Sequence, residues 1–371
     1  MIDAGLTALA VWFPAHVRTN DEVRARHPAV VADAEERSLA RMFAVTEPEN
    51  EFDRAMQPYV RDPFRGTVER RVLGAGESGV GLEVAAARAA LAASALGPGD
   101  VDCLISSAFV PDEIGVGNAV FVARELGLDC EAWNLETACS GSVVGLRTAA
   151  SLVRAGEHRR VLVTVSCNYS RTAVDSDTLS WFVGDGAAAM LVGPVPAGEG
   201  YLGGVAVHTA DTCGSWFYAL EEADGGPRIA MRATPGTGRV LSRTAPAYLR
   251  ACVEGAARKA GVSLRDIAFF VFNTPTAWLA EFAARELGID LERTVSTYPR
   301  FANTGPVLMP TNLHHAASQG RIARGDLVML FSIGSVSSAS AAVIRWGEVA
   351  LGPPIKRGDA DSSAHHRGMA L

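Results

Sequence analysis

Cys139 is the residue of this 371-residue chain whose surroundings most favour covalent chemistry. It stands in the stretch Thr-Ala-Cys-Ser-Gly-Ser at residues 137–142, and an apolar pattern typical of a helix follows over residues 140–155. A thiol at a helix N-terminus lies beside unpaired N–H groups and the positive end of the dipole, so we expect a lowered pKa. Small neighbours leave room for a substrate carbonyl and for N–H donors around it. These features favour a nucleophile, and the alternative is a cysteine buried where a strand meets a helix.

Composition and cysteine spacing argue against several classes of protein. The net charge of −7 and the pI near 5.7 lack the basic footprint of a nucleic-acid binder. Polar residues interrupt every apolar stretch, so we expect no membrane span. No pair among the six cysteines has the C-x-x-C spacing of a zinc or redox site, and the first residues lack a basic signal segment. We therefore expect a cytoplasmic protein with free thiols and no metal site.

An internal repeat predicts how the chain positions Cys139. The heptapeptide ARELGLD at residues 123–129 returns as ARELGID at residues 284–290. After each copy we expect a short strand, at residues 132–135 and 294–297, then a loop and a helix. Cys139 and Asn303 stand at nearly corresponding points of the two copies. Strand and helix patterns that alternate with short links predict an α/β fold of two similar halves with largely buried strands.

These patterns suggest the organisation of the chain. We expect an N-terminal half at residues 1–195 that carries the nucleophile and a C-terminal half at residues 200–347 that carries Asn303. A duplicated fold places its site between the halves, where corresponding loops meet. Residues 20–72, rich in Arg, Glu and Pro, are expected to be an insertion outside the repeat. Residues 352–371 are expected to form a mobile tail.

Three motifs in order resemble the thiolase superfamily, and specifically the ketoacyl-ACP synthase III type. They are ETACSG at residues 136–141, VGDGAAA at residues 183–189 and NTG at residues 303–305. The resemblance spans nearly the whole chain and implies a duplicated α-β-α-β-α layered fold with pseudo-twofold related halves. It also implies a homodimer, a pantetheine tunnel for CoA or acyl carrier protein, and no tightly bound cofactor. It assigns Cys139 as the residue that takes an acyl group as a thioester, with Asn303 and Gly305 beside it.

One position departs from the family. Condensing members pair the cysteine with a histidine and an asparagine, which assist decarboxylation of a malonyl thioester. Asn273 stands where that histidine would be. An amide can donate to an oxyanion but cannot take a proton at neutral pH. We therefore expect Asn273 and Asn303 to hold a thioester carbonyl oxygen, with Thr274 and Thr276 as further hydrogen-bonding candidates for the substrate.

A base other than the family histidine must then be sought. His208 follows an apolar run at the start of the second half and is our candidate base, with a structural histidine at a strand end as the alternative. Asp112 and Glu113 are the acidic alternative, since their loop could reach the same cleft. An ordinary solvated turn is the simpler explanation of these two carboxylates, and we favour it.

An intact nucleophile motif without the decarboxylation histidine predicts an acyltransferase. Cys139 would take an acyl group from acyl-ACP or acyl-CoA and pass it, without decarboxylation, to a hydroxyl, amine or thiol of a small-molecule acceptor in polyketide-type secondary metabolism. One alternative is a decarboxylative, Claisen-condensing ketoacyl synthase of the starter-unit type. Another is a catalytically inactive partner subunit, against which the intact cysteine loop argues.

Overall fold

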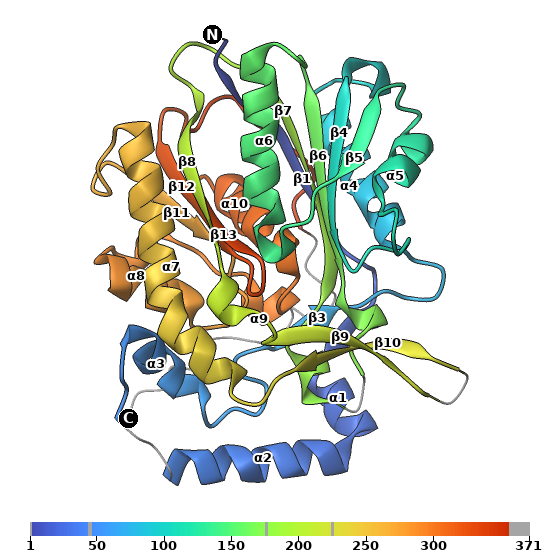
Figure 1. Ribbon diagram of the computed structural model, residues 1–371, viewed down its shortest axis with the longest axis vertical. Coiled ribbons are helices and arrows are strands. Elements are labelled where there is room, and N and C mark those ends of the chain that lie inside the picture. Colours follow the sequence, from blue (N-terminus) through green and yellow to red (C-terminus); the bar gives the residue numbers. More distant parts are fainter. Residues whose placement is uncertain (1, 44–46, 175–176, 224–225, 356–371) are drawn as a thin grey trace.

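Two β-sheets form the centre of the protein in a computed structural model that describes residues 2–43, 47–174, 177–223 and 226–355 (Figure 1). The larger sheet has the strand order β14-β1-β7-β6-β4-β5. Its strands are β1 (Ala4–Trp12), β4 (Cys103–Phe109), β5 (Glu131–Asn134), β6 (Val161–Asn168), β7 (Asp185–Pro194) and β14 (Ala350–Leu351). β14 returns from the end of the described chain to pair with β1, so residues beyond 347 complete the first sheet.

The smaller sheet repeats the central order of the larger one. Its order is β11-β12-β13-β8, made of β8 (Gly200–His208), β11 (Phe269–Phe272), β12 (Leu327–Ile333) and β13 (Ser338–Arg345). β11 is parallel to β12 as β4 is to β6, and β12 is antiparallel to β13 as β6 is to β7. The predicted duplicated α/β fold is therefore confirmed.

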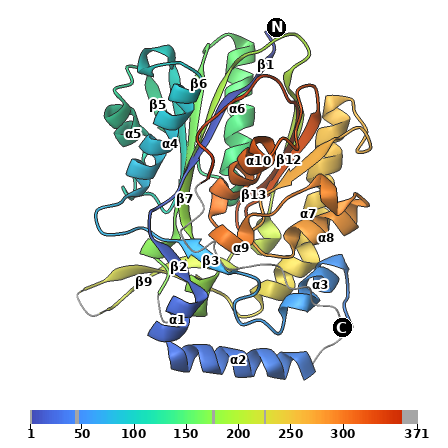
Figure 2. The ribbon, with the colours of Figure 1, turned by 180° about the vertical axis from the view of Figure 1, so that it is seen from behind.

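Helices make three layers around the two sheets (Figures 1 and 2). α6 (Gly141–Ala155) and α10 (Leu308–Ser318) lie between the sheets. α4 (Gly79–Ala93) and α5 (Ala119–Leu126) cover the larger sheet, while α7 (Thr237–Ala260) and α8 (Leu279–Leu287) cover the smaller one. Among the described helices, none combines the length and the apolar character needed to cross a membrane.

The repeated heptapeptide ends two equivalent helices. Gly127 closes α5 and Gly288 closes α8, with φ angles of 69° and 62° in the left-handed region that favours glycine. In each copy the next residue donates its N–H to the carbonyl of the repeat's alanine, at 2.9 Å in the first copy and 3.0 Å in the second. The heptapeptide recurs because both helices need the same C-terminal cap.

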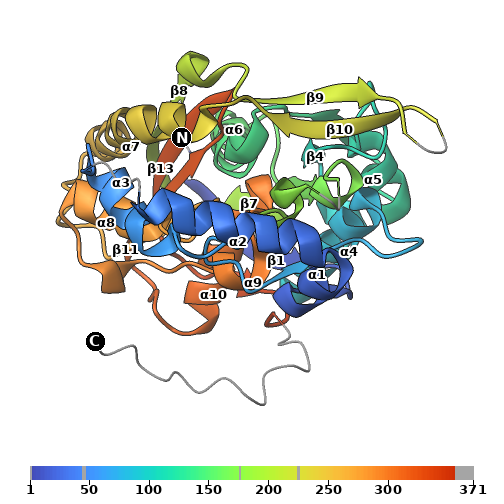
Figure 3. The ribbon, with the colours of Figure 1, turned by 90° about the horizontal axis from the view of Figure 1, so that it is seen from below.

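Elements outside the repeat gather at one end of the layers (Figure 3). They are α1 (Asn20–Arg26), α2 (Pro28–Phe43), α3 (Glu51–Met56), β2 (Val17–Thr19), β3 (Glu69–Arg71) and a hairpin of β9 (Trp216–Glu221) and β10 (Arg228–Ala233). α3 packs against α7 and α8, so the segment expected to be an insertion adds a wall to this end.

Two local expectations differ from the structure. Residues 294–297 form no strand, because the N–H and the hydroxyl of Thr297 both donate to Oδ1 of Asn312, at 2.9 and 2.7 Å. The side chain of Asn312 replaces the ladder that a neighbouring strand would supply. The expected start of the tail at Gly352 was too early in the chain, because the N–H of Gly352 donates to the carbonyl of Leu9 at 2.8 Å. Residues 356–371 lie outside the described residues.

A buried carboxylate ties α4 to the larger sheet. Glu83 is fully buried and accepts four hydrogen bonds from neutral donors. The donors are Ser106 at 2.7 Å, Asn118 at 2.8 Å, Thr164 at 2.6 Å and Ser166 at 2.7 Å. A buried charge is tolerated when its lone pairs are satisfied in this way, so Glu83 fixes the strands that lead to the Cys139 region.

Candidate active site

Cys139 lies in a single 3-10 turn, η3 (Ala138–Ser140), directly before α6. Ala138 has a φ of 51°, in the left-handed region that residues other than glycine rarely adopt. Oε1 of Glu136 accepts a hydrogen bond from the N–H of Ala138 at 2.6 Å and so holds this turn. A strained backbone that its surroundings fix in place is typical of a functional position.

Two serines of the smaller sheet also fix the cysteine turn. Ser332 on β12 donates its hydroxyl to the carbonyl oxygen of Cys139 at 2.5 Å. Ser338 on β13 lies with its Oγ 2.8 Å from Oγ of Ser140. Gly334 passes so close that a Cβ there would lie 3.1 Å from the N of Cys139. The cysteine turn is therefore held between the two sheets.

Cys139 opens into a cavity of about 220 Å³. Its walls are mostly apolar and come from both sheets, α3, α7 and the β9–β10 hairpin. They comprise Phe52, Phe109, Tyr169, Val183, Trp216, Tyr218, Met231, Leu241, Ala245, Pro275, Thr276, Leu279, Asn303, Ile333, Ser335 and Val336. Among the described residues, this lining includes no histidine, carboxylate, lysine or arginine, so this part of the site offers hydrogen-bond donors but no strong base.

The pKa of Cys139 differs in direction from the sequence-based expectation. Burial, with a smaller contribution from the negative charge of Glu136, raises the pKa of this thiol to about 12. A hydrogen bond from Tyr169 acts in the opposite direction. Desolvation of the thiolate outweighs the stabilising groups here, because the cysteine is only 8% exposed. The expectation of a lowered pKa was wrong for this resting state.

Asn303 faces the same cavity as Cys139. Its backbone bridges to Val183, because its N–H bonds the carbonyl of Phe182 at 2.9 Å and its carbonyl accepts from Gly184 at 3.0 Å. Oδ1 of its side chain accepts from the N–H of Gly305 at 2.9 Å. That bond directs the remaining Nδ2 donors elsewhere, and they are suited to an oxyanion beside Cys139.

Asn273 is not arranged as an oxyanion donor. It is fully buried and is not part of the cavity lining. Its Nδ2 donates to the carbonyl of Ile333 at 3.2 Å, and its Oδ1 accepts from the N–H of Ile333 at 3.0 Å. The side chain thereby continues the β11–β12 pairing beyond Phe272. The amide of Asn273 thus makes the two hydrogen bonds that the backbone of a further β11 residue would make with Ile333. This explains why an amide side chain stands at this position.

The two threonines that follow Asn273 in the same loop differ in whether they face the cavity. Thr274 is fully buried, and its Oγ1 accepts from Nδ2 of Asn312 at 3.1 Å, so it supports the loop. Thr276 lines the cavity, and among the described residues its buried Oγ1 has no hydrogen-bonding partner. A buried hydroxyl without a partner is suited to a polar group of a substrate. Gly305 has a φ of 55° and packs against Cys167, where a Cβ would lie 3.2 Å from Sγ.

His208 lies at the end of β8 with an exposed side chain. Its Nδ1 accepts a hydrogen bond from the N–H of Ala210 at 3.4 Å. The described walls of the Cys139 cavity do not include it. The structure thus places the candidate base at a strand end on the surface, as the structural alternative anticipated.

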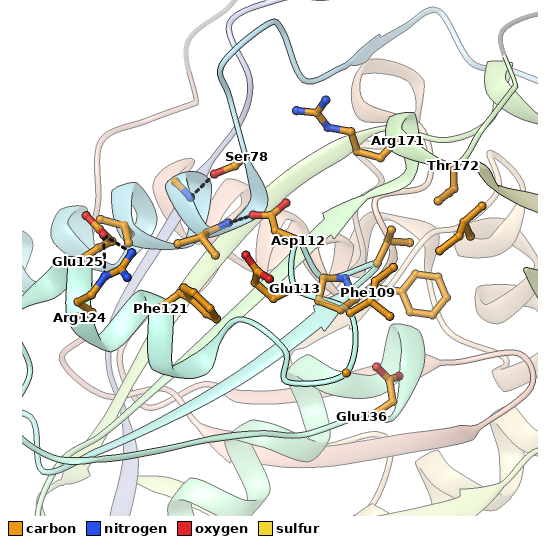
Figure 4. Close-up of a pocket in the computed structure, with 18 of the residues that line it drawn as sticks. Ser78, Phe109, Asp112, Glu113, Phe121, Arg124, Glu125, Glu136, Arg171 and Thr172 are labelled. Carbon is orange, nitrogen blue, oxygen red and sulfur yellow. Dashed lines mark hydrogen bonds and ion pairs between the residues drawn. The ribbon is translucent and has the colours of Figure 1, made fainter. Parts of the chain in front are cut away.

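Asp112 and Glu113 line a second, outer cavity of about 1170 Å³ (Figure 4). The carboxylate of Asp112 accepts from the N–H groups of Gly79 and Val80, at 3.1 and 2.7 Å, and so caps α4. The outer cavity meets the Cys139 cavity at Phe109 and Tyr218, which line both. The acidic loop therefore borders the approach to the site without reaching Cys139.

The sequence-based search missed three polar residues of the site. Tyr169 and Tyr218 both line the cavity of Cys139, and burial raises the pKa of each phenol above its ordinary value. Glu136 borders the outer cavity, and desolvation raises its pKa (Figure 4). Glu136 lay within the quoted motif and could have been noticed. The two tyrosines are far from Cys139 in sequence and gave no signal.

A second cluster of chemically active side chains lies away from the site. Sulfur, carboxylate and imidazole atoms of Cys103, Glu131 and His158 lie within 4.8 Å of one another. His158 and Glu131 already pair at 2.6 Å. Cys103 begins β4, whereas the cavity-lining Phe109 ends it, so the cluster lies at the opposite end of that strand. It takes no part in the chemistry of Cys139.

The duplicated α/β fold, with a cysteine at the head of the helix between two sheets, is the thiolase fold. Family models described as 3-oxoacyl-[acyl-carrier-protein] synthase III match residues 133–211 and, for the C-terminal part, residues 257–346. Beta-ketoacyl-[acyl-carrier-protein] synthase III of Brucella suis is 32% identical over 289 residues, which cover 76% of this chain and 88% of the relative. The chain belongs to the ketoacyl-ACP synthase III family of acyl-transferring enzymes.

Solved structures show the same architecture. The 3-oxoacyl-(acyl carrier protein) synthase III of Pseudomonas aeruginosa PAO1 superposes with a TM-score of 0.76 at 22% identity, covering 93% of this chain and 98% of that one. A priming beta-ketosynthase from a polyketide biosynthetic pathway superposes with a TM-score of 0.78 at 22% identity, covering 95% and 98%. These similarities establish the fold for almost the whole chain.

Proposed function

We propose that this protein is an acyltransferase that works without decarboxylation. Cys139 takes an acyl group from an acyl carrier protein or CoA thioester and passes it to a hydroxyl, amine or thiol acceptor. The observation that carries this proposal is the contrast between two positions. The cysteine turn is intact and is held by serines of the smaller sheet, whereas Asn273, at the histidine position of condensing relatives, is bonded to Ile333.

The first half-reaction needs only groups that face the cavity. The thiolate of Cys139 attacks the carbonyl carbon of the thioester, and Nδ2 of Asn303 stabilises the oxygen as it becomes negative. The C–S bond to the carrier then breaks, and the carrier thiolate takes up the proton that Cys139 released. The product is an acyl-Cys139 thioester and a free carrier thiol.

The second half-reaction favours an acceptor that is already nucleophilic. The described lining of the Cys139 cavity includes no histidine or carboxylate that could take a proton from the acceptor. An amine attacks a thioester as the neutral base, whereas a hydroxyl needs help from a base. Glu136, at the border of the outer cavity, is the carboxylate closest in sequence to Cys139 and is our candidate for that help.

The setting of the enzyme follows from the same departures. Loss of the decarboxylation histidine suits an enzyme that tailors or primes a product in polyketide-type secondary metabolism rather than one that extends a chain.

β5 ends the larger sheet as an open edge, and Trp133 on it is 43% exposed. Ile114 and Val116, in the loop between β4 and α5, are 72% and 64% exposed. Such an apolar edge supports the proposal of a homodimer.

Mass measurement of the intact protein tests the proposal. The wild type and Cys139→Ser are incubated with acyl-CoA and acyl-ACP donors, and released CO₂ is counted from carboxyl-labelled malonyl-ACP. We expect an acyl adduct on the wild type alone and no CO₂ above the Cys139→Ser background. CO₂ release that depends on Cys139 would favour the condensing alternative. No adduct from any donor would favour the inactive-subunit alternative.

A further inference from the structure

Cys103, Glu131 and His158 form a cluster of potential metal ligands away from the Cys139 cavity. Sγ of Cys103, a carboxylate oxygen of Glu131 and an imidazole nitrogen of His158 all lie within 4.8 Å of one another. Among the described residues, these are the three side chains whose ligand atoms lie close enough together for one metal ion. No metal site was expected from the sequence, because no cysteine pair has C-x-x-C spacing and these residues belong to separate elements.

The larger sheet brings the three side chains together. β6, β4 and β5 lie side by side in it (Figure 1). Cys103 begins β4 and Glu131 begins β5, and the register of these parallel strands pairs the two residues directly. His158 lies in the loop between α6 and β6, and Val161 at the start of β6 pairs with Cys103 from the other side. Backbone pairing thus places all three residues at one edge of the sheet.

Asp102 holds the loop that carries His158. Its two carboxylate oxygens accept hydrogen bonds from the N–H groups of Arg159 and Arg160, at 2.7 and 2.9 Å. Its own N–H donates to the carbonyl of Arg160 at 3.1 Å. Asp102 precedes Cys103 in the chain, and Arg159 follows His158. These bonds therefore tie the sulfur and the imidazole to each other through the backbone, as the residues around metal ligands commonly do.

The exposure of the three side chains increases from sulfur to carboxylate. Cys103 is fully buried, whereas the side chains of His158 and Glu131 are 17% and 59% exposed. A cation can therefore enter from solvent beside Glu131 and meet sulfur on its inner side. Sulfur, imidazole and carboxylate together are a ligand set of Zn²⁺, whereas Ca²⁺ and Mg²⁺ take oxygen ligands. A thiolate and a carboxylate also balance the two positive charges of the ion.

We propose that Cys103, His158 and Glu131 bind one Zn²⁺, with water as the fourth ligand on the exposed side. Ligand atoms of a tetrahedral Zn²⁺ lie about 3.3–3.6 Å apart. Nε2 of His158 and Oε1 of Glu131 pair at 2.6 Å, so the exposed carboxylate moves outward by about 1 Å as the ion enters. The thiol of Cys103 releases its proton to solvent, and a bond from sulfur to zinc replaces the S–H bond.

The bound ion joins β4, β5 and the loop before β6, so it stabilises the open edge of the larger sheet. This inference is independent of the proposed function. Six residues of β4 separate Cys103 from the cavity-lining Phe109, a distance of about 20 Å along the strand.

The test titrates the full chain, freed of metal by a chelator, with Zn²⁺ and with Co²⁺, which takes the same ligands and absorbs light. We expect one Zn²⁺ per chain with a Kd of about 1 μM or tighter. Bound Co²⁺ should show a sulfur-to-cobalt charge-transfer band and the visible bands of tetrahedral coordination. At a Zn²⁺ concentration of about 100 times Kd, Tm should rise by about 3 °C.

Three variants each remove one ligand. Cys103→Ala and His158→Gln should weaken Zn²⁺ binding at least about 100-fold, and Glu131→Gln at least about tenfold. His158→Gln changes a loop residue, so it keeps the test valid if Cys103→Ala fails to fold. His16→Gln is the matched control. His16 pairs with Glu22 at 3.5 Å, but among the described residues no third ligand completes that pair, so this variant should bind Zn²⁺ as the wild type does.

Four outcomes overturn the inference. They are no saturable binding of either ion, a Co²⁺ spectrum without the charge-transfer band, equal affinity in the wild type and His158→Gln, and loss of binding in His16→Gln. Failure of Cys139 to form an acyl adduct with any donor would refute the proposed function alone, since the Zn²⁺ titration needs no acyl donor.

Discussion

Replacing Asn273 and Asn303 separately by alanine distinguishes two roles that the sequence assigned jointly. The structure predicts that Asn273→Ala destabilises the protein with little direct effect on chemistry. Two hydrogen bonds to Ile333 are lost, and the N–H and carbonyl of that 8% exposed residue stay buried without partners. At about 1–3 kcal/mol for each unsatisfied group, the expected loss is about 3 kcal/mol.

Thermal unfolding gives the corresponding shift. A chain of this length has an unfolding entropy of about 0.8 kcal/mol/K, so about 3 kcal/mol lowers Tm by about 4 °C. Asn303→Ala loses one hydrogen bond at a half-buried position and should lower Tm by about 1 °C. Its single-turnover acylation should nevertheless fall by about 10²-fold or more, because a donor to the oxyanion is gone.

The assay combines calorimetry with mass measurement of acyl-Cys139 over time, both at one temperature well below Tm. Asn273→Ala is expected to retain acylation within about threefold of the wild type. The reasoning would be refuted by the opposite pattern, in which Asn273→Ala keeps its Tm and loses more than about tenfold in acylation rate. Asn273 would then be an oxyanion donor after all.

Three further predictions concern charge and burial. The rate of alkylation of Cys139 by iodoacetamide, measured by peptide mass mapping, should rise about tenfold per pH unit from about pH 7 to pH 10. The thiolate fraction grows by this factor as long as the pH stays below the pKa of about 12. A rate that levels off below about pH 9 would contradict this prediction. Glu136→Gln keeps an acceptor for the N–H of Ala138 but removes the charge that raises the pKa of Cys139, so alkylation at about pH 8 should rise about two- to fivefold. If Glu136 assists the acceptor, hydroxyl acylation should fall in the same variant. Glu83→Ala leaves four buried donors unsatisfied and should lower Tm by at least about 4 °C, whereas an unchanged Tm would show that the cluster adds nothing to stability.

The sequence by itself determined the class of protein and indicated Cys139 as the candidate nucleophile. Periodicity is a local property, so the helix after Cys139 and the alternation of strands and helices could be read from neighbouring residues. The repeated heptapeptide revealed the duplication, because both copies carry the glycine that a left-handed helix end requires. The order of three motifs then gave the family, and the family gave Asn303 as the partner of Cys139.

Only the tertiary structure decided the electrostatics of the site and the roles of its partners. The pKa of Cys139 depends on how deeply packing buries it, and no local pattern gives the balance between burial and a helix end. The side chain of Asn273 forms hydrogen bonds with the backbone of Ile333, which lies 60 residues further along the chain. Tyr169 and Cys139 line one cavity only because β6 ends beside the start of α6. Contacts between residues distant in sequence are set by the packing of whole elements, and that packing places His208 on the surface and Tyr169 in the cavity of Cys139.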